Sequence, residues 1–209
     1  MESIIKVYEG GVIVIVDTHL LLSTILYKYI EKNMNFKLDR IAFAYGNIKP
    51  DFIYKEINCP HTLTESLYCV NKYSDKLMRD DDIDIRKFSM KLGVICHFTC
   101  DYFCLYHRDG NEKKGVFQHL FYESILHIKL MKLLLSGKLR THNYETHGNT
   151  LEEIIMKVDK KYNSDTEGLT RDINYALSAA TQISRLIVYS SQLYFQQNQA
   201  KIIDKYILG

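Results

Sequence analysis

The sequence predicts an all-α protein that folds as a single compact multi-helix domain over residues 1–209. Only two prolines, Pro50 and Pro60, occur in the chain, and most of the 10 glycines lie at the ends of apolar-periodic stretches. Between these breaks, apolar residues recur every three or four positions, as they do on one face of a helix. A chain of this size buries roughly 70% of the surface that its unfolded form exposes, which is enough for one hydrophobic core.

In the N-terminal half, the sequence predicts two helices joined by a long loop. Residues 12–16 are all β-branched and could form a short strand or an extended lead-in. A helix over about 19–33 follows, with leucines and isoleucines at helical spacing. Residues 45–63 contain both prolines and a glycine, so we expect a connecting loop there. The next helix covers 64–78 and begins at one of two threonines, Thr62 or Thr64.

In the C-terminal half, the most apolar helix is expected over 82–107. A run of three aspartates precedes it, and negative charge is favourable at a helix N-terminus. A second strong helix is predicted over 116–136 and ends at a Ser-Gly pair. After a polar loop at 140–149, we expect an amphipathic helix over 150–162 and one or two helices over 168–206.

The composition is that of a soluble globular protein. Lys plus Arg number 27 and Asp plus Glu 25, so the formal net charge is only +2, which argues against a long nucleic acid as the partner. No stretch approaches the roughly 18 uncharged apolar residues of a membrane span, although contact with a membrane surface remains compatible with the sequence. The apolar run at 12–16 is short and lacks a basic region before it, so we expect no signal peptide and a cytoplasmic location.

The five cysteines are an odd number, in a chain long enough to need no cross-links. Three of them follow one another at four-residue spacing, which places them on one helix face without good disulfide geometry. We therefore expect reduced thiols. Thiolate ligation of a metal is one interpretation, but buried thiols on a helix more often pack as small hydrophobic groups, and we favour packing for these three: Cys96, Cys100 and Cys104.

Histidines and carboxylates recur at a spacing that suits metal binding. His97 and Asp101 are four residues apart, as are His119 and Glu123, so each pair shares a helix face. His107 would lie about 15 Å beyond His97 if the helix continues, too far for both to bind one ion. The spacing therefore predicts two neighbouring metal ions, with the Asp101 carboxylate able to bridge.

The stretch Gly93-Val-Ile-Cys-His-Phe-Thr-Cys-Asp-Tyr-Phe-Cys-Leu-Tyr-His107, followed by His119-Leu-Phe-Tyr-Glu123, resembles the ligand signature of the zinc-dependent phospholipase C family, H-x3-D-x5-H-x11-H-x3-E. This family includes bacterial phospholipases C and the N-terminal domain of α-toxins. Three upstream segments resemble the family's earlier ligand segments, and they contain His19, Asp51 and His61. By motif, the resemblance covers roughly residues 19 to 130.

The resemblance implies a ligand set for each of two zinc ions. The first ion would be held by Asp51, His61, His97 and Asp101. The second would be held by a further trio of side chains together with water: His107, His119 and Glu123. Imidazoles favour zinc, but a carboxylate-rich pair could also take iron or manganese.

The third metal site of the family is incomplete here. Secreted relatives use an N-terminal tryptophan, and this chain contains no tryptophan. His19 and Asp101 alone would make a weak site. Asp17 could add a ligand if the segment before His19 is extended, but a helix cap is the simpler role for Asp17. His127, one turn after Glu123, is expected either to support a ligand or to lie on the polar surface.

The resemblance implies a metal-dependent phosphodiesterase that cleaves a phospholipid to diacylglycerol and a phosphorylated head group. Asp51 is the candidate general base, because a ligating carboxylate can still accept a proton from bound water. We expect no C-terminal lipid-binding β domain, since nothing in 140–209 is predicted as β. Two alternatives remain: a zinc nuclease or nucleotidase of similar fold, and a catalytically degenerate protein stabilised by its metals. The oligomeric state is not predicted.

Overall fold

The computed structural model describes residues 2–52, 59–108, 115–139 and 148–207, of which 2–17, 116 and 200–207 are described by their backbone only. The described residues form eight α-helices and one short 3-10 helix, without a strand, which confirms the predicted all-α class. In chain order they are α1 (Glu2–Met34), α2 (Arg40–Phe52), α3 (Leu63–Met78), α4 (Ile85–Asp101), η1 (Leu105–His107), α5 (Val116–Leu135), α6 (Leu151–Ser164), α7 (Leu169–Ser190) and α8 (Gln192–Ile207).

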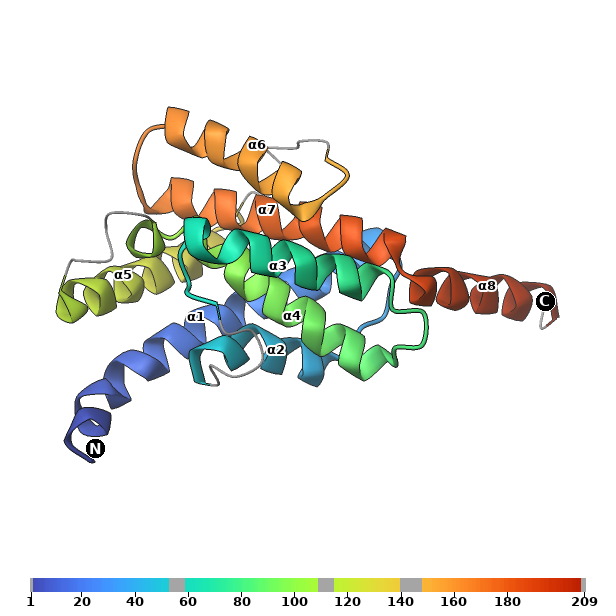
Figure 1. Cartoon of the computed structure of the whole chain (residues 1–209), viewed down its shortest axis with the longest axis horizontal. Helices are drawn as coiled ribbons and strands as arrows, with labels where there is room; N and C mark the ends of the chain where they lie inside the picture. The colour runs from blue at the N-terminus through green and yellow to red at the C-terminus, as the bar shows by residue number, and fades with distance from the viewer. Residues whose placement is uncertain (1, 53–58, 109–114, 140–147, 208–209) are drawn as a thin grey trace.

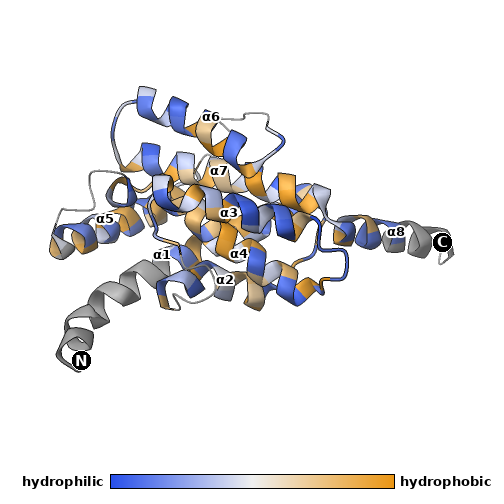
Figure 2. Ribbon diagram, in the orientation of Figure 1, coloured by the Kyte–Doolittle hydropathy of each residue, from blue (hydrophilic) through white to orange (hydrophobic). Residues whose placement is uncertain are grey.

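Helices α4 and α7 run through the middle of the bundle, and α8 projects beyond it (Figure 1). Hydrophilic residues gather on α6 at the edge of the bundle, whereas hydrophobic residues concentrate around α4 (Figure 2). On α4, every residue from Leu92 to Asp101 is buried. Because so apolar a helix lies inside the bundle, any polar side chain that it carries must find its partner within the protein.

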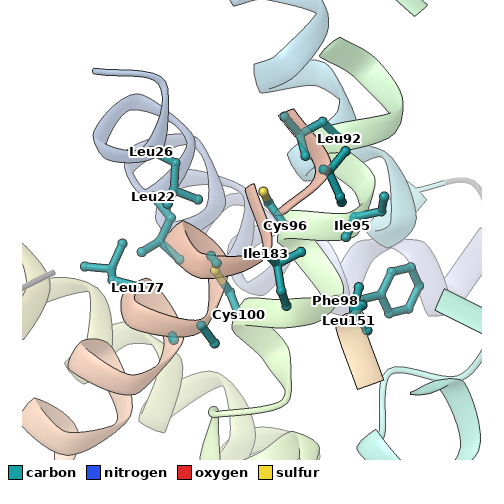
Figure 3. Packing of buried hydrophobic residues seen from close by; sticks show 14 of the residues in the cluster. Leu22, Leu26, Leu92, Ile95, Cys96, Phe98, Cys100, Leu151, Leu177 and Ile183 are labelled. Carbon is teal, nitrogen blue, oxygen red and sulfur yellow. The ribbon is translucent and has the colours of Figure 1, made fainter. Parts of the chain in front are cut away.

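The buried core joins residues that are far apart in sequence. Leu22 and Leu26 of α1, Ile95 of α4 and Ile183 of α7 belong to one hydrophobic cluster (Figure 3). Cys96 and Cys100 are drawn among these residues, and burial raises the pKa of the Cys96 thiol to about 12. These two thiols thus pack as small hydrophobic groups, as the sequence predicted.

Two predictions for the N-terminal half are wrong. Residues 12–16 are not a strand or an extended lead-in, because α1 is helical from Glu2. Residues 45–63 are not all loop, because α2 extends to Phe52 with Pro50 in its last turn. Proline is tolerated there because only one backbone hydrogen bond, to the carbonyl of Gly46, is lost before the helix ends.

The prediction of reduced thiols is wrong for one pair, because Cys59 and Cys69 form a disulfide with a Cα–Cα distance of 6.8 Å. Cys59 precedes α3 and Cys69 lies on its second turn, so the chain must fold back to bring them together. The spacing of the cysteines in the sequence therefore could not predict this pairing. Cys96, Cys100 and Cys104 are free and buried, as expected.

Among the residues that the structure describes, no helix is long and apolar enough to cross a membrane. The segment 168–206 forms two helices that break at Ser191, whose backbone is extended. The single domain over residues 1–209 stays a prediction.

Candidate metal centre

The C-terminal end of α4 carries the most buried polar pair of the site. His97 is fully buried and Asp101 is 3% exposed. Their spacing of one helical turn brings His97 Nε2 within 3.1 Å of Asp101 Oδ2. The structure therefore places this pair on one face of α4, as the spacing required.

A close approach between α2 and α4 adds a second carboxylate. Gly46 and Gly93 face one another where the helices cross, and a Cβ on Gly93 would lie 2.3 Å from the carbonyl oxygen of Phe43. Without side chains at either glycine, the two backbones come close enough for Asn47 O to accept a hydrogen bond from His97 Nδ1 at 2.8 Å. One turn later on α2, Asp51 Oδ1 lies 3.6 Å from His97 Nε2.

The Asp101 carboxylate lies between histidines from two other parts of the chain. Its Oδ1 is 3.3 Å from His19 Nε2 on α1, and its Oδ2 is 3.0 Å from His61 Nδ1, just before α3. The ring centres of His19 and His97 are 4.1 Å apart, and those of His61 and His97 are 5.1 Å apart. Each oxygen of Asp101 thus faces a different group of imidazoles, an arrangement that suits a bridging carboxylate.

A second cluster forms between η1 and α5. Glu123 Oε1 is 2.9 Å from His119 Nε2 and 3.4 Å from His107 Nε2. The ring of Tyr106 stacks on His119 with centres 5.2 Å apart. Glu123 is 6% exposed, so its carboxylate depends on the two imidazoles for polar contact.

The two clusters are closer than one continuous helix would allow. The prediction of a helix to residue 107 is wrong, because α4 ends at Asp101 and the chain turns into η1. His107 is therefore brought back toward the first cluster, and its ring centre lies 5.7 Å from that of His61. Ligand atoms of His61, Asp101 and His107 all lie within 4.8 Å of one another.

Charges within the site stabilise one another. Burial alone would raise the pKa of Asp101, but the surrounding imidazoles, His97 first, hold it well below its usual value. Burial alone would lower the pKa of His97, but Asp101 and Asp51 raise it. The neighbouring histidines, His107 first, likewise lower the pKa of Glu123 against the effect of burial. The carboxylates are thus held ionised and require positive charge beside them.

Unsatisfied atoms show that the residues present fit a metal. His97 Nδ1 must carry a hydrogen, because the carbonyl of Asn47 can only accept. In a neutral ring, Nε2 then directs a lone pair at the carboxylates of Asp101 and Asp51, which is repulsive unless a cation lies between them. Buried atoms without a hydrogen-bond partner in the structure include His97 Nε2, Asp51 Oδ2, His119 Nε2, Glu123 Oε2 and His19 Nδ1. Nitrogen and carboxylate donors of this kind suit zinc.

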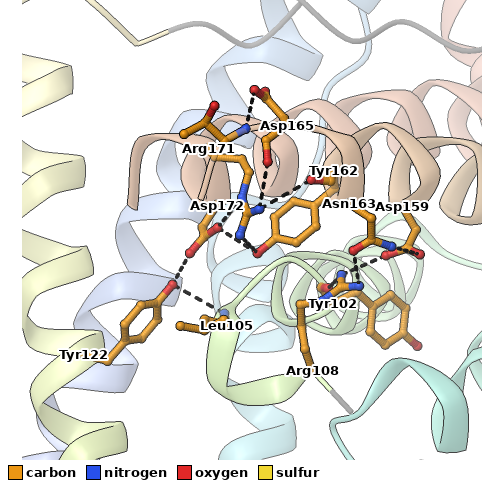
Figure 4. A network of polar contacts seen from close by, with 11 residues as sticks. Tyr102, Leu105, Arg108, Tyr122, Asp159, Tyr162, Asn163, Asp165, Arg171 and Asp172 are labelled. Carbon is orange, nitrogen blue, oxygen red and sulfur yellow. Dashed lines mark hydrogen bonds and ion pairs between the residues drawn. The ribbon is translucent and has the colours of Figure 1, made fainter. Parts of the chain in front are cut away.

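A buried polar network holds the turn that carries His107 (Figure 4). The Asp172 carboxylate accepts hydrogen bonds from Tyr122 and, at 2.7 Å, from Tyr162. The Tyr122 oxygen in turn accepts the backbone N–H of Leu105, the first residue of η1, at 3.4 Å. The network therefore links α7 and α5 to the turn between the two clusters.

One supporting residue, Asn47, lay outside the predictions. Asn47 orients His97 through its backbone carbonyl, and the sequence offered only the paired glycines as a signal for that approach. His127 contacts Thr18, with Nδ1 3.0 Å from Oγ1, next to His19 in sequence. As a ligand, Asp17 required an extended segment before His19, and as a cap it required a helix that begins after it. Neither condition holds, because α1 is already helical at residue 17. The Asp17 side chain lies outside the described part.

A family model described as zinc dependent phospholipase C matches residues 18–194. This match covers most of the chain and all eight predicted ligand residues, so the protein belongs to the zinc-dependent phospholipase C family. Membership makes it a phospholipase C-like protein of a hydrolase family. No curated protein and no solved structure matches the chain.

Proposed function

We propose that the protein is a zinc-dependent phosphodiesterase that hydrolyses a phospholipid on the glycerol side of its phosphate, giving diacylglycerol and a phosphorylated head group. The observation that carries this proposal is the pair of adjacent histidine–carboxylate clusters, in which several buried nitrogen and oxygen atoms have no hydrogen-bond partner. Family membership supports the choice of a phospholipid as the substrate class.

The chain supplies candidate ligands from six segments. The first cluster would hold zinc through Asp51, His61, His97 and Asp101. The second would hold zinc through His107, His119 and Glu123. His19 faces Oδ1 of Asp101, the carboxylate that would also bind the first ion. Bound zinc would lower the pKa of a coordinated water and neutralise charge on the phosphoryl oxygens.

Asp51 is the residue that we assign as general base. Its Oδ1 faces His97, while its buried Oδ2 has no partner and can accept a proton from water. Asn47 holds His97 in place, so the geometry between the Asp51 carboxylate and the imidazole is fixed by α2. One side chain would therefore both bind metal and take the proton.

The test is head-group release from phosphatidylcholine vesicles by zinc-loaded protein, with zinc measured in the same samples. The variant Asp51→Asn should lose about 10²–10⁴-fold in rate if it keeps its zinc. Asp81→Asn, at an exposed position, is the matched control and should retain full activity. Cleavage of a single-stranded oligonucleotide in place of lipid would favour a nuclease. Full zinc content without turnover of either substrate would favour a protein that its metals only stabilise.

Helix α5 presents a face that suits contact with a lipid surface. Phe117, Phe121, Ile128, Met131 and Leu135 are 40–81% exposed, and their spacing places them within one arc of the helix. Its one acidic residue, Glu123, is buried, whereas exposed Lys132 lies beside the apolar arc. An apolar face flanked by positive charge is complementary to an anionic bilayer.

Sedimentation with vesicles of phosphatidylserine and phosphatidylcholine tests this surface. Each buried phenylalanine contributes at least about 1.5 kcal/mol, so Phe117→Ser with Phe121→Ser should weaken binding more than ~10-fold. Phe195→Ser, which alters an exposed phenylalanine on α8, is the control and should bind normally. Equal sedimentation of all three proteins would exclude α5 as the contact surface.

Cytoplasmic location stays a prediction. The disulfide between Cys59 and Cys69 removes one of its premises, because such bonds persist mainly in oxidising compartments.

A further inference from the structure

Cys104 stands apart from the other buried thiols because of its neighbours. Its Sγ and ligand atoms of His107 and Glu123 all lie within 4.8 Å of one another. Cys96 instead contacts Ser184 Oγ at 3.4 Å on α7. Cys100, one turn before Cys104 in sequence, belongs to none of the clusters of metal-binding groups among the described residues.

Local backbone structure explains why Cys104 and His107 converge. Cys104 caps η1, and the N–H of His107 donates to the carbonyl of Cys104 at 3.0 Å. The turn that this hydrogen bond closes leaves the Cys104 Sγ and a ring nitrogen of His107 within 4.8 Å of one another, although the backbone of Cys104 itself is extended. The Cys-x-x-His spacing thus aims a sulfur and an imidazole at the same point, as short ligand pairs in zinc sites do.

A second observation points to a ligand at this position. Glu123 is 94% buried, and its Oε2 has no hydrogen-bond partner in the structure. Cys104 and Glu123 line one largely apolar cavity, which Cys100 also lines, so the distance from Cys104 to the ligand atoms of His107 and Glu123 sets it apart from Cys100.

We propose that Cys104 is a protein ligand of the second zinc ion beside His107 and Glu123, whose ligand atoms lie close to its Sγ. His119, whose Nε2 is 2.9 Å from Glu123 Oε1, would complete the set, so that Cys104 takes the place of water. The proposal rests on the proposed function, since it assumes that this cluster binds zinc. As the bond forms, the Sγ–H proton passes to solvent and a sulfur lone pair is donated to zinc, with no change of oxidation state.

Four protein ligands give this ion a different role from an open zinc. Four-coordinate zinc held only by protein side chains is typical of structural sites. The thiolate and the Glu123 carboxylate together cancel the charge of the ion, which reduces its power to acidify water. The second ion would therefore fix η1 to α5 and leave activation of water to the Asp51 side of the centre.

X-ray absorption at the zinc edge tests this ligand directly, using the full-length protein loaded with zinc without thiol reductant. Zinc–sulfur bonds are about 2.3 Å and zinc–nitrogen bonds about 2.0 Å, so one sulfur ligand is resolved. We expect a sulfur shell in the wild-type protein and in Cys100→Ser, and none in Cys104→Ser. Cys104→Ser should also lose its second zinc to a chelator at a concentration at least ~10-fold lower, since even an outer partner of a ligand affects affinity by 10–100-fold.

The outcomes separate the two proposals. Two bound zinc ions without a sulfur shell in wild-type protein would overturn the role of Cys104 and leave the proposed function standing. No bound zinc would overturn both. The wild-type spectrum decides the question even if Cys104→Ser fails to fold.

Discussion

Replacing Gly93 with alanine probes the helix contact on which the first cluster depends. The new Cβ would lie 2.3 Å from Phe43 O and 3.0 Å from both Asn47 N and the Gly46 Cα. These are backbone atoms, so no side chain can move aside. To bring the closest pair to an ordinary contact of 3.4 Å, α2 must retreat by about 1.1 Å.

Two opposing effects decide the stability of this variant. Alanine is a better helix former than glycine, which alone would stabilise the protein by about 1 kcal/mol. Overpacking that displaces backbone costs about 1–3 kcal/mol, and here it acts at a crossing of two helices. We therefore expect a net loss in the free energy of unfolding, measured by urea denaturation.

The same displacement should weaken metal binding. A shift of about 1.1 Å would lengthen the bond between Asn47 O and His97 Nδ1, now 2.8 Å, beyond hydrogen-bonding distance. Loss of such a partner lowers metal affinity about 10–100-fold, which competition with a chromophoric chelator measures. Gly115→Ala, where nothing lies within 4 Å of the new Cβ, is the control. A Gly93→Ala protein that is as stable as wild type and binds zinc equally well would refute this reasoning.

Two further predictions concern the charges of the site and the disulfide. Because the pKa of His97 is raised above 6.5, its pairing with Asp101 stabilises the metal-free protein below that pH and is lost as pH rises through the shifted pKa. Zinc displaces the histidine protons. Above pH 6.5, the melting temperature should therefore fall with pH in the presence of chelator and rise with pH in the presence of zinc. Parallel curves of melting temperature against pH would contradict this. The double variant Cys59→Ser, Cys69→Ser should lose ~2–3 kcal/mol in unfolding free energy, because a short loop is no longer closed. It should also bind zinc more weakly, since His61 lies two residues after Cys59, and unchanged zinc affinity would show that the disulfide does not position His61.

Helices with a clear amphipathic pattern could be predicted from the sequence. The predicted helix 64–78 differs from α3 by one residue, because its apolar spacing and flanking polar residues are local signals. Helix α2 was missed because Pro50 and Gly46 are local signals for a loop. Their actual roles depend on position and on tertiary contact, since Pro50 falls in the last turn and Gly46 packs on α4.

Contacts between distant residues also determine where α4 ends. No proline or glycine lies between Asp101 and His107 to stop the helix. Instead, the turn after it is held by the Tyr102 hydroxyl, 2.8 Å from Ser66 Oγ, and by Arg108, which donates to the carbonyl of Tyr102 at 3.2 Å. Ser66 lies on α3, so the bend that brings His107 toward the first cluster could not be derived from spacing.

The site was predictable where its residues share a helix turn. Spacing alone paired His97 with Asp101, and the structure places the two in contact. His19 and His61 could be associated with this pair only through the resemblance, because their approach depends on how α1 and the start of α3 pack. The support from Asn47 and the approach of Cys104 to the second cluster depend on backbone turns that no motif recorded.

Zinc content per chain tests the central claim most directly. It is measured by elemental mass spectrometry on untagged protein purified without added metal or chelator. We predict two or more zinc ions per wild-type chain, and a joint loss in the double variant His97→Ala, Glu123→Ala. Less than one ion per chain in every batch, with none regained on adding zinc, would contradict the assignment of these clusters as a metal centre.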